Sequence, residues 1–453
     1  MQLRQLSSRL IARDYLPLRS VTLRWIEVQR FILGATVTLF VLGFLSLTSA
    51  EAGFASRFSL SLQEEYNDNI FFQKDKEADF ITFISPTLSL FYAFPGQTVP
   101  VFQANLTTSG QIFARHSEAS NFGDNIRFNT TYTHFYSPRL TFYVSDAVSL
   151  VGNSRTGEFG LGTGTIRPPT TLPPTGELPT GGRTDNPVSS GRQIQNNFSL
   201  NGAYTYNPNI SFVADYGFRY ANFLDRGGSE WSQRVNGRGV YKWRDEHNIH
   251  FGYGIEIIKT RDGESNVIHN FDIGDDYFSS YKIQLDPTLT IVASSGLSIN
   301  AGSGGPRVAN NTNVTLTKLW EKASVNVGGR KGLTPSLGVS GISDTTSFFA
   351  NSNIRLTEFL SASAGVDYSL FDTNKVNFSS FQATASAAYR IASWLSSSLQ
   401  YAHRWVNTPS ASGANSTDLL TKGKINSNSV SLVFTATLDV WPNFGLSRGA
   451  GLP

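Results

Sequence analysis

Apolar residues alternate with small or polar residues along most of the chain. Between positions 360 and 370 every even residue is apolar and every odd residue is small or polar, and the same rhythm occupies 210–220, 249–257 and 429–440. A period of two residues predicts β-strands with one apolar and one polar face. The chain holds far more of these half-apolar strands than one soluble core can bury.

The length of the alternating stretches indicates a membrane barrel. Each stretch is close to the roughly 9 to 11 residues that a tilted strand needs to cross a bilayer. Strands cross lipid only in a closed barrel, because an open sheet edge leaves backbone groups unpaired. We predict an all-β fold, a transmembrane antiparallel up-and-down β-barrel of about 18 strands, with 16 as the alternative, carrying short periplasmic turns and longer extracellular loops.

Turn-forming residues between the strands give this count. Long connections are expected at 73–79, 116–124, 154–191, 224–229, 262–266, 301–311, 333–343, 372–377 and 406–427. Short ones are expected at 93–97, 137–139, 207–209, 244–247, 279–286, 320–322, 357–359 and 392–394. The division is least distinct over 265–300, which is where the alternative of 16 strands arises.

The N-terminal segment has the features of an export signal. An uncharged run follows Arg30, and Ala50, Glu51 and Ala52 form a small-x-small cleavage site, so 1–52 is expected to be a cleaved signal peptide; a membrane helix is the alternative. The barrel is then expected over 53–441, with a Pro/Gly/Thr-rich extracellular loop at 154–191 and a periplasmic tail at 442–453.

Composition removes several classes of function. Cysteine is absent and Met1 is the only methionine, which excludes disulfides and cysteine nucleophiles. Residues 1–52 hold six Arg and three acidic residues, so 31 basic and 31 acidic side chains remain after them. A near-neutral body gives no reason to expect nucleic-acid binding.

Polar positions opposite the apolar faces are candidates for the wall of a channel. They include Asp215, Arg219, Glu256, Arg355, Asp367, Arg390, Gln400, Arg404 and Asp439. A barrel of about 18 strands is wide enough for a water-filled passage. Both charge signs occur, so a strongly anion-selective filter is not indicated. The same residues also suit a second role, in which they solvate the lumen and brace the wall with ion pairs.

Tryptophans mark the expected edges of the membrane. The predicted girdle consists of Trp231, Trp243, Trp320, Trp394, Trp405 and Trp441. Three of them fall at short turns, Trp441 follows the last strand, and Trp231 and Trp405 fall at the opposite strand ends. Indole rings prefer the headgroup level, so two rings of them support the membrane assignment.

Asp146 does not fit its surroundings. It lies in the series Leu140, Phe142, Val144, Val148, Leu150, which is expected to face lipid. A carboxylate there is costly. Either a bulge near Ser145 reverses the phase of the strand or a partner covers the site; we expect the bulge.

Catalytic and metal sites are not predicted. The chain lacks the Gly-x-Ser-x-Gly elbow. The acidic cluster at 64–69 lacks the spacing of a calcium loop. We therefore expect no enzyme activity, no metal and no cofactor.

The segment 64–90 resembles the opening of the beta-barrel porin 2 family of bacterial outer-membrane proteins. The matching motif contains Glu65, Tyr66, Asn67, Asp68 and Asn69, and the following strand begins at Asp79. The resemblance implies an outer-membrane porin that serves exopolysaccharide export, beside a periplasmic polysaccharide-export protein, with outer-membrane lipid and a polysaccharide as further partners. The alternatives are a general diffusion porin for small solutes and a loop-plugged structural or adhesion barrel.

Overall fold

The computed structural model describes residues 53–72, 74–94, 100–151, 192–224, 227–244, 247–259, 263, 265–278, 288–302, 306–335, 342–373, 376–411 and 423–441. The predicted signal peptide (1–52), extracellular loop (154–191) and C-terminal tail (442–453) lie outside these residues. Within them, no helix is long and apolar enough to cross a membrane.

Within the described ranges the chain forms 18 strands and one short 3-10 helix. They are β1 (Gly53–Asn67), β2 (Asp79–Ala93), β3 (Phe102–Phe113), η2 (Ser117–Ala119), β4 (Asn121–Ser137), β5 (Leu140–Val151), β6 (Gln193–Asn207), β7 (Ile210–Phe223), β8 (Ser229–Arg244), β9 (His247–Lys259), β10 (Ser265–Phe278), β11 (Leu289–Gly302), β12 (Arg307–Leu319), β13 (Ala323–Pro335), β14 (Ile342–Arg355), β15 (Leu360–Thr373), β16 (Val376–Ala392), β17 (Leu395–Ala411) and β18 (Gly423–Trp441).

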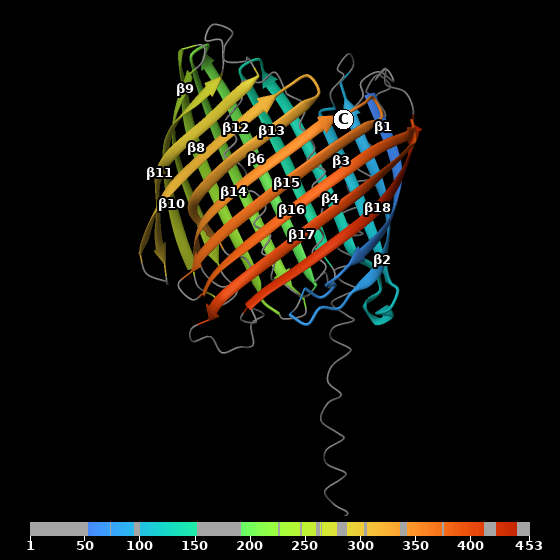
Figure 1. The fold of residues 1–453 in the computed structure, drawn as a ribbon. Coiled ribbons are helices and arrows are strands. Elements are labelled where there is room, and N and C mark those ends of the chain that lie inside the picture. The colour runs from blue at the N-terminus through green and yellow to red at the C-terminus, as the bar shows by residue number, and fades with distance from the viewer. Residues whose placement is uncertain are drawn as a thin grey trace, which may run out of the picture. The chain divides into compact units, whose positions relative to one another are not determined.

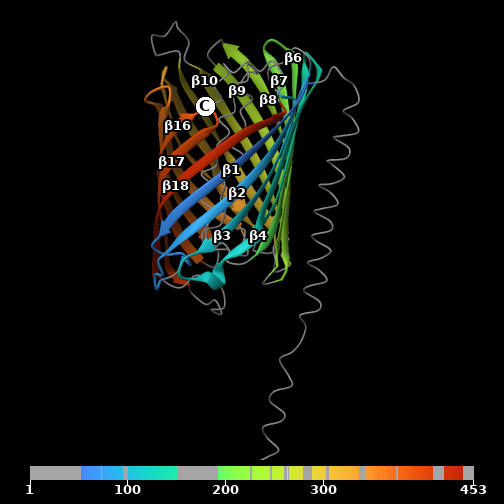
Figure 2. The same cartoon turned by 90° about the vertical axis from the view of Figure 1, so that its right-hand side faces the viewer.

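Each strand pairs with its neighbours in sequence, and the first strand pairs with the last. All of these strands belong to one 18-stranded sheet (Figure 1). β1 and β18 run antiparallel and side by side from Ser56↔Trp441 to Asn67↔Ser429 (Figure 2). This pairing closes the sheet, so the predicted 18-stranded antiparallel barrel is confirmed and the alternative of 16 strands is wrong.

The strands are longer than the membrane requires. They range from 12 residues in β3 to 19 residues in β18, against roughly 9 to 11 for a bilayer crossing. Backbone pairing does not depend on apolar side chains, so the ladders continue past the alternating segments into polar sequence.

This extension corrects several predicted connections. β15 ends at Thr373 and β16 begins at Val376, so only two residues separate the strands where a long connection was expected at 372–377. Only four residues separate β11 from β12, where 301–311 was expected. The short connections expected at 137–139, 207–209 and 392–394 are confirmed, with two residues between the strands at each.

The bulge expected near Ser145 is absent. β5 pairs with β6 without interruption from Leu140↔Tyr204 to Val151↔Gln193, and Asp146 lies opposite Phe198 within this run. On its other edge, β5 has a register shift only beside Phe135 and Ser137 of β4. The prediction was wrong because Asp146 keeps the phase of its strand, which its neighbours on both sides fix.

Candidate functional site

The two faces of the barrel wall differ sharply in character. On β18, Leu432, Phe434 and Leu438 are 42 to 64% exposed, whereas Ser429 and Ser431, on the opposite face, are 5 to 7% exposed. Successive side chains of a strand point to opposite sides of the sheet. The apolar series therefore forms the outer surface of the barrel and the serine series its inner surface.

Large apolar side chains are exposed all around the outer surface. Phe212 on β7, Phe251 on β9 and Phe348 on β14 are each at least half exposed. Apolar surface on this scale is not found on a soluble monomer. A closed barrel with an apolar outer surface is an integral membrane protein of the bacterial outer-membrane type.

The register assigns all nine candidate wall residues to the inner face, because directly opposed residues share a face. These are Asp215, Arg219, Glu256, Arg355, Asp367, Arg390, Gln400, Arg404 and Asp439. Gln400, for example, lies opposite Ser431, and Arg404 opposite Ser427.

Several wall charges are held by their neighbours rather than left free. The Asn236 amide donates a 2.6 Å hydrogen bond to Asp215, and an Arg234 nitrogen lies 3.8 Å from the same carboxylate. Arg219 donates to Asn197 at 3.3 Å. These contacts show how residues of the inner face brace the wall.

A buried ion-pair cluster on β8–β10 was missed by the sequence analysis. An Arg238 nitrogen lies 3.1 Å from Asp272, and His250 Nε2 lies 3.5 Å from the same oxygen. All three residues are less than 9% exposed. They share the phase of the predicted wall residues, so the alternation pattern was the signal that could have found them.

Glycine makes room for this cluster. A Cβ atom at Gly252 would overlap the Asp272 carboxylate, and one at Gly274 would lie 2.6 Å from the His250 ring. The close approach of the two side chains to the wall therefore depends on glycine at both positions.

The connection between β1 and β2, residues 68–78, folds into the mouth of the barrel; we call it the mouth loop. Ile70 is fully buried against Ile81 and Phe113 on the inner face of β2 and β3. Phe72 packs against Phe371, Phe378 and Val406 on the inner face of β15–β17. The mouth loop thus contacts two separate parts of the inner wall.

Phe72 is held tightly in this position. The guanidinium carbon of Arg404 lies 4.4 Å from the centre of its ring, within the range of a cation–π interaction. Phe72 also adopts a φ of 46°, a left-handed conformation that costs a non-glycine residue about 1–2 kcal/mol. The packing around the ring has to offset this strain.

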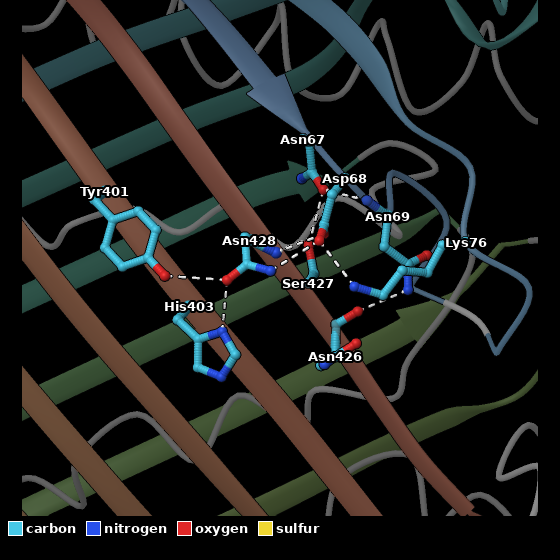
Figure 3. A network of polar contacts seen from close by, with 9 residues as sticks. All are labelled: Asn67, Asp68, Asn69, Lys76, Tyr401, His403, Asn426, Ser427 and Asn428. Carbon is cyan, nitrogen blue, oxygen red and sulfur yellow. Dashed lines mark hydrogen bonds and ion pairs between the residues drawn. The ribbon is translucent and has the colours of Figure 1, made fainter.

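The family-like motif at the end of β1 anchors the mouth loop to β18 (Figure 3). Asn67 Oδ1 accepts hydrogen bonds from the Asn69 backbone and the Ser427 hydroxyl. Asp68 accepts one from the Asn428 backbone, one from its amide at 2.8 Å, and one from Lys76 at 2.8 Å.

Four further contacts surround this anchor. The Asn69 amide donates to the Asn426 carbonyl at 2.8 Å. Glu65, on the inner face, accepts from Gln63 and Asn67. Tyr66 faces outward, where its ring centre lies 5.1 Å from that of Phe80. The motif is therefore a structural anchor in this chain.

Asp68 is stabilised in its charged form. Partial burial opposes ionisation, but the hydrogen bonds from Lys76 and Asn428, with the positive charge of Lys76, outweigh it and lower the pKa of Asp68. The anchor therefore keeps a carboxylate at neutral pH.

A second anchor holds the other end of the mouth loop. His116, in the connection between β3 and β4, lies between Glu77 and Asp79, with each ring nitrogen 2.9 Å from a carboxylate oxygen. The bond to Asp79 raises the pKa of His116; burial opposes this and the bond to Glu77 adds to it. The Phe71 ring meets the imidazole edge-on at 5.4 Å.

The tryptophans lie near strand ends, several beside a cation. Trp243, Trp320 and Trp394 are 51 to 58% exposed at short turns. Lys424 lies 5.1 Å from the Trp405 ring centre at the opposite end of the wall. Trp231 lies opposite Lys259 on β9. Trp441 ends β18, and its side chain lies outside the described residues.

Solved structures to which the chain is similar at low sequence identity include three bacterial proteins. Pseudomonas aeruginosa OpdL is matched with a TM-score of 0.44 and 12% identity over 86% of this chain and 99% of that one. P. aeruginosa OpdQ has a TM-score of 0.42 and 13% identity, over 86% of this chain and 98% of that one. Acinetobacter baumannii OccAB4 has a TM-score of 0.42 and 10% identity, over 85% of this chain and 98% of that one. No protein-family model and no curated protein matches the sequence. The membrane assignment therefore rests on the register and apolar surface of the barrel itself.

Proposed function

We propose that this protein is an outer-membrane porin that admits small hydrophilic solutes through the lumen of its barrel. The inner face carries serine, asparagine, arginine and carboxylate side chains, which suit a hydrated passage. Passage of a solute through the lumen breaks no covalent bond, so under this proposal the protein is a channel and not an enzyme.

The observation that carries this proposal is the inward position of the mouth loop. Ile70 and Phe72 contact inner-face residues of β2–β3 and of β15–β17, so the loop occupies part of the passage. A narrowed mouth limits the size of the solute that passes. This favours the diffusion of small solutes over the passage of a wide polymer.

Exopolysaccharide export with a periplasmic partner is the second candidate. It is favoured by the resemblance at 64–90 and by the mixture of hydroxyl, amide and paired charges on the inner face. For a polymer chain to pass, the mouth loop has to leave the position that its two anchors hold.

Liposome swelling distinguishes these functions. Purified protein is reconstituted into liposomes, which are transferred to sugars of increasing size, and single-channel conductance is recorded in parallel. We expect steady conductance and swelling rates that fall steeply between a monosaccharide and a trisaccharide. Swelling that is independent of sugar size supports a wide export pore, and absence of both signals supports a plugged barrel; either result overturns the proposal.

A further inference from the structure

Asp146 faces the membrane from the middle of a strand. It lies opposite Thr130 of β4 and Phe198 of β6, on the face that also carries the exposed Tyr132 and Leu200. It is the seventh of the twelve residues of β5. A carboxylate in contact with lipid at this depth is expensive, which makes it a candidate for contact with protein.

Asn196 satisfies this carboxylate only in part. Its amide donates a 2.8 Å hydrogen bond to one oxygen of Asp146, and among the described residues this is the carboxylate's one hydrogen bond. A carboxylate has two oxygens and accepts several hydrogen bonds, and an amide nitrogen has two hydrogens to donate. On the outer surface, the Asp146 carboxylate can therefore accept further hydrogen bonds, and the Asn196 amide can donate one more.

A row of small residues crosses the same outer face. Gly202, Ala214 and Gly237 lie in this row across β6, β7 and β8, four positions along β6 from Phe198. The ring of Phe142 packs against Gly202, whereas a Cβ atom at Gly237 would meet no other atom within 4 Å. Small residues let a second wall approach closely within a membrane.

We propose that a second copy of this chain covers the outer face of β5–β8 and that Asp146 accepts a hydrogen bond from Asn196 of the partner subunit. A surface that carries an acceptor, Asp146, beside donors, Asn196 and the Thr130 hydroxyl, is complementary to itself. Self-complementarity is what a symmetric interface requires. Contact with protein also removes the carboxylate from lipid.

Cross-linking in native outer membranes tests this surface directly. The chain contains no cysteine, so a single engineered thiol reports one position. Val148→Cys lies beside Asp146 on the same outer face, opposite Asn196. Val366→Cys, on the outer face of β15 and 45% exposed, is the matched control. A short bis-maleimide is expected to join two copies at position 148 and not at position 366.

Variants of Asp146 then test its part in the interface. In the Val148→Cys background, Asp146→Leu is expected to lower the yield of dimer about tenfold, as the loss of a charged hydrogen bond predicts, while Asp146→Asn retains most of it. Heat-modifiable migration on gels and an unchanged single-channel conductance verify that each variant folds, because Asp146 does not contact the lumen.

Three results would overturn the proposal. They are cross-linking that is absent or equal at the two thiol positions, an Asp146→Leu variant that dimerises like the parent, and a product joined to a different protein. None of these depends on which solute the barrel admits.

Discussion

The guanidinium group of Arg404 covers the ring of Phe72 at 4.4 Å, joining the inner wall of β17 to the mouth loop. The two residues come from opposite ends of the sequence, and they meet because closure of the barrel pairs β18 with β1 and so places β17 one strand away. This contact, with the apolar cluster around it, sets the position of the mouth loop.

Phe72→Ala is expected to raise the single-channel conductance. The substitution removes the packing against Phe371 and Phe378 and a cation–π contact of about 1–2 kcal/mol, so the mouth loop is released from the wall. Conductance in planar bilayers measures the effect. Phe348→Ala, at an exposed outer position, is the control, and equal conductance in both variants contradicts a narrowing role for the mouth loop.

Acid is expected to loosen the first anchor. Because the pKa of Asp68 is lowered in the folded protein, its contribution to stability is present above the unfolded pKa of about 3.9 and is lost as pH falls through the folded value. The noise of the single-channel current should therefore increase at low pH. The Asp68→Asn variant should show at neutral pH the noise that the parent shows at low pH. Asp75 is an exposed residue of the same loop, and the Asp75→Asn variant should behave like the parent.

Alkaline pH is expected to loosen the second anchor. The pKa of His116 is raised, so its stabilising contribution is complete below the unfolded pKa of about 6.5 and is lost as pH rises through the folded value. Cleavage after Lys76 by a lysine-specific protease should accelerate over this range.

The histidine variants separate this effect from the protease's own pH dependence. His116→Gln should make cleavage fast at every pH. His134→Gln, whose side chain bonds Tyr132 on the outer face, should preserve the parental profile. If the cleavage rate of His116→Gln depends on pH as that of the parent does, His116 does not hold the mouth loop.

Removing Asp272 is expected to destabilise the barrel far more than removing Asp439. Asp272→Ala leaves Arg238 and His250 buried beside an empty site, which costs about 3 kcal/mol or more. The Asp439 carboxylate pairs with Arg57 in an exposed position, where a pair contributes about 0–1 kcal/mol. Denaturant unfolding in detergent micelles compares the two, and similar losses contradict the assignment.

The alternation of side chains predicted the wall well and the mouth poorly. It determines the face of Asp215 or Gln400 because one residue of shift would reverse the whole strand. The same alternation placed Arg238, Asp272 and His250 on the inner face, but their contacts depend on the register of β8, β9 and β10, which the pattern does not set. Ile70 and Phe72 lie in a connection without periodicity, so no pattern of residues indicates that they turn inward.

The bulge expected near Asp146 shows that the cost of one side chain in lipid does not predict the register of its strand. The cost of a carboxylate in lipid led to an expected bulge, whereas the pairing of β5 with both neighbours holds it in phase. Hydrogen-bonded register is a property of three strands together, and one unfavourable side chain does not overturn it.

The anchor of the mouth loop also has a consequence for the order of assembly. Asp68 and Asn428 are 360 positions apart, and their bond requires β1 and β18 to be paired already. The second anchor and the packing of Ile70 need only the first three strands and the connection that follows them. The bond of Asp68 to Asn428 is different, because it forms only when the last strand meets the first, so this end of the mouth loop reaches its final position at closure of the barrel.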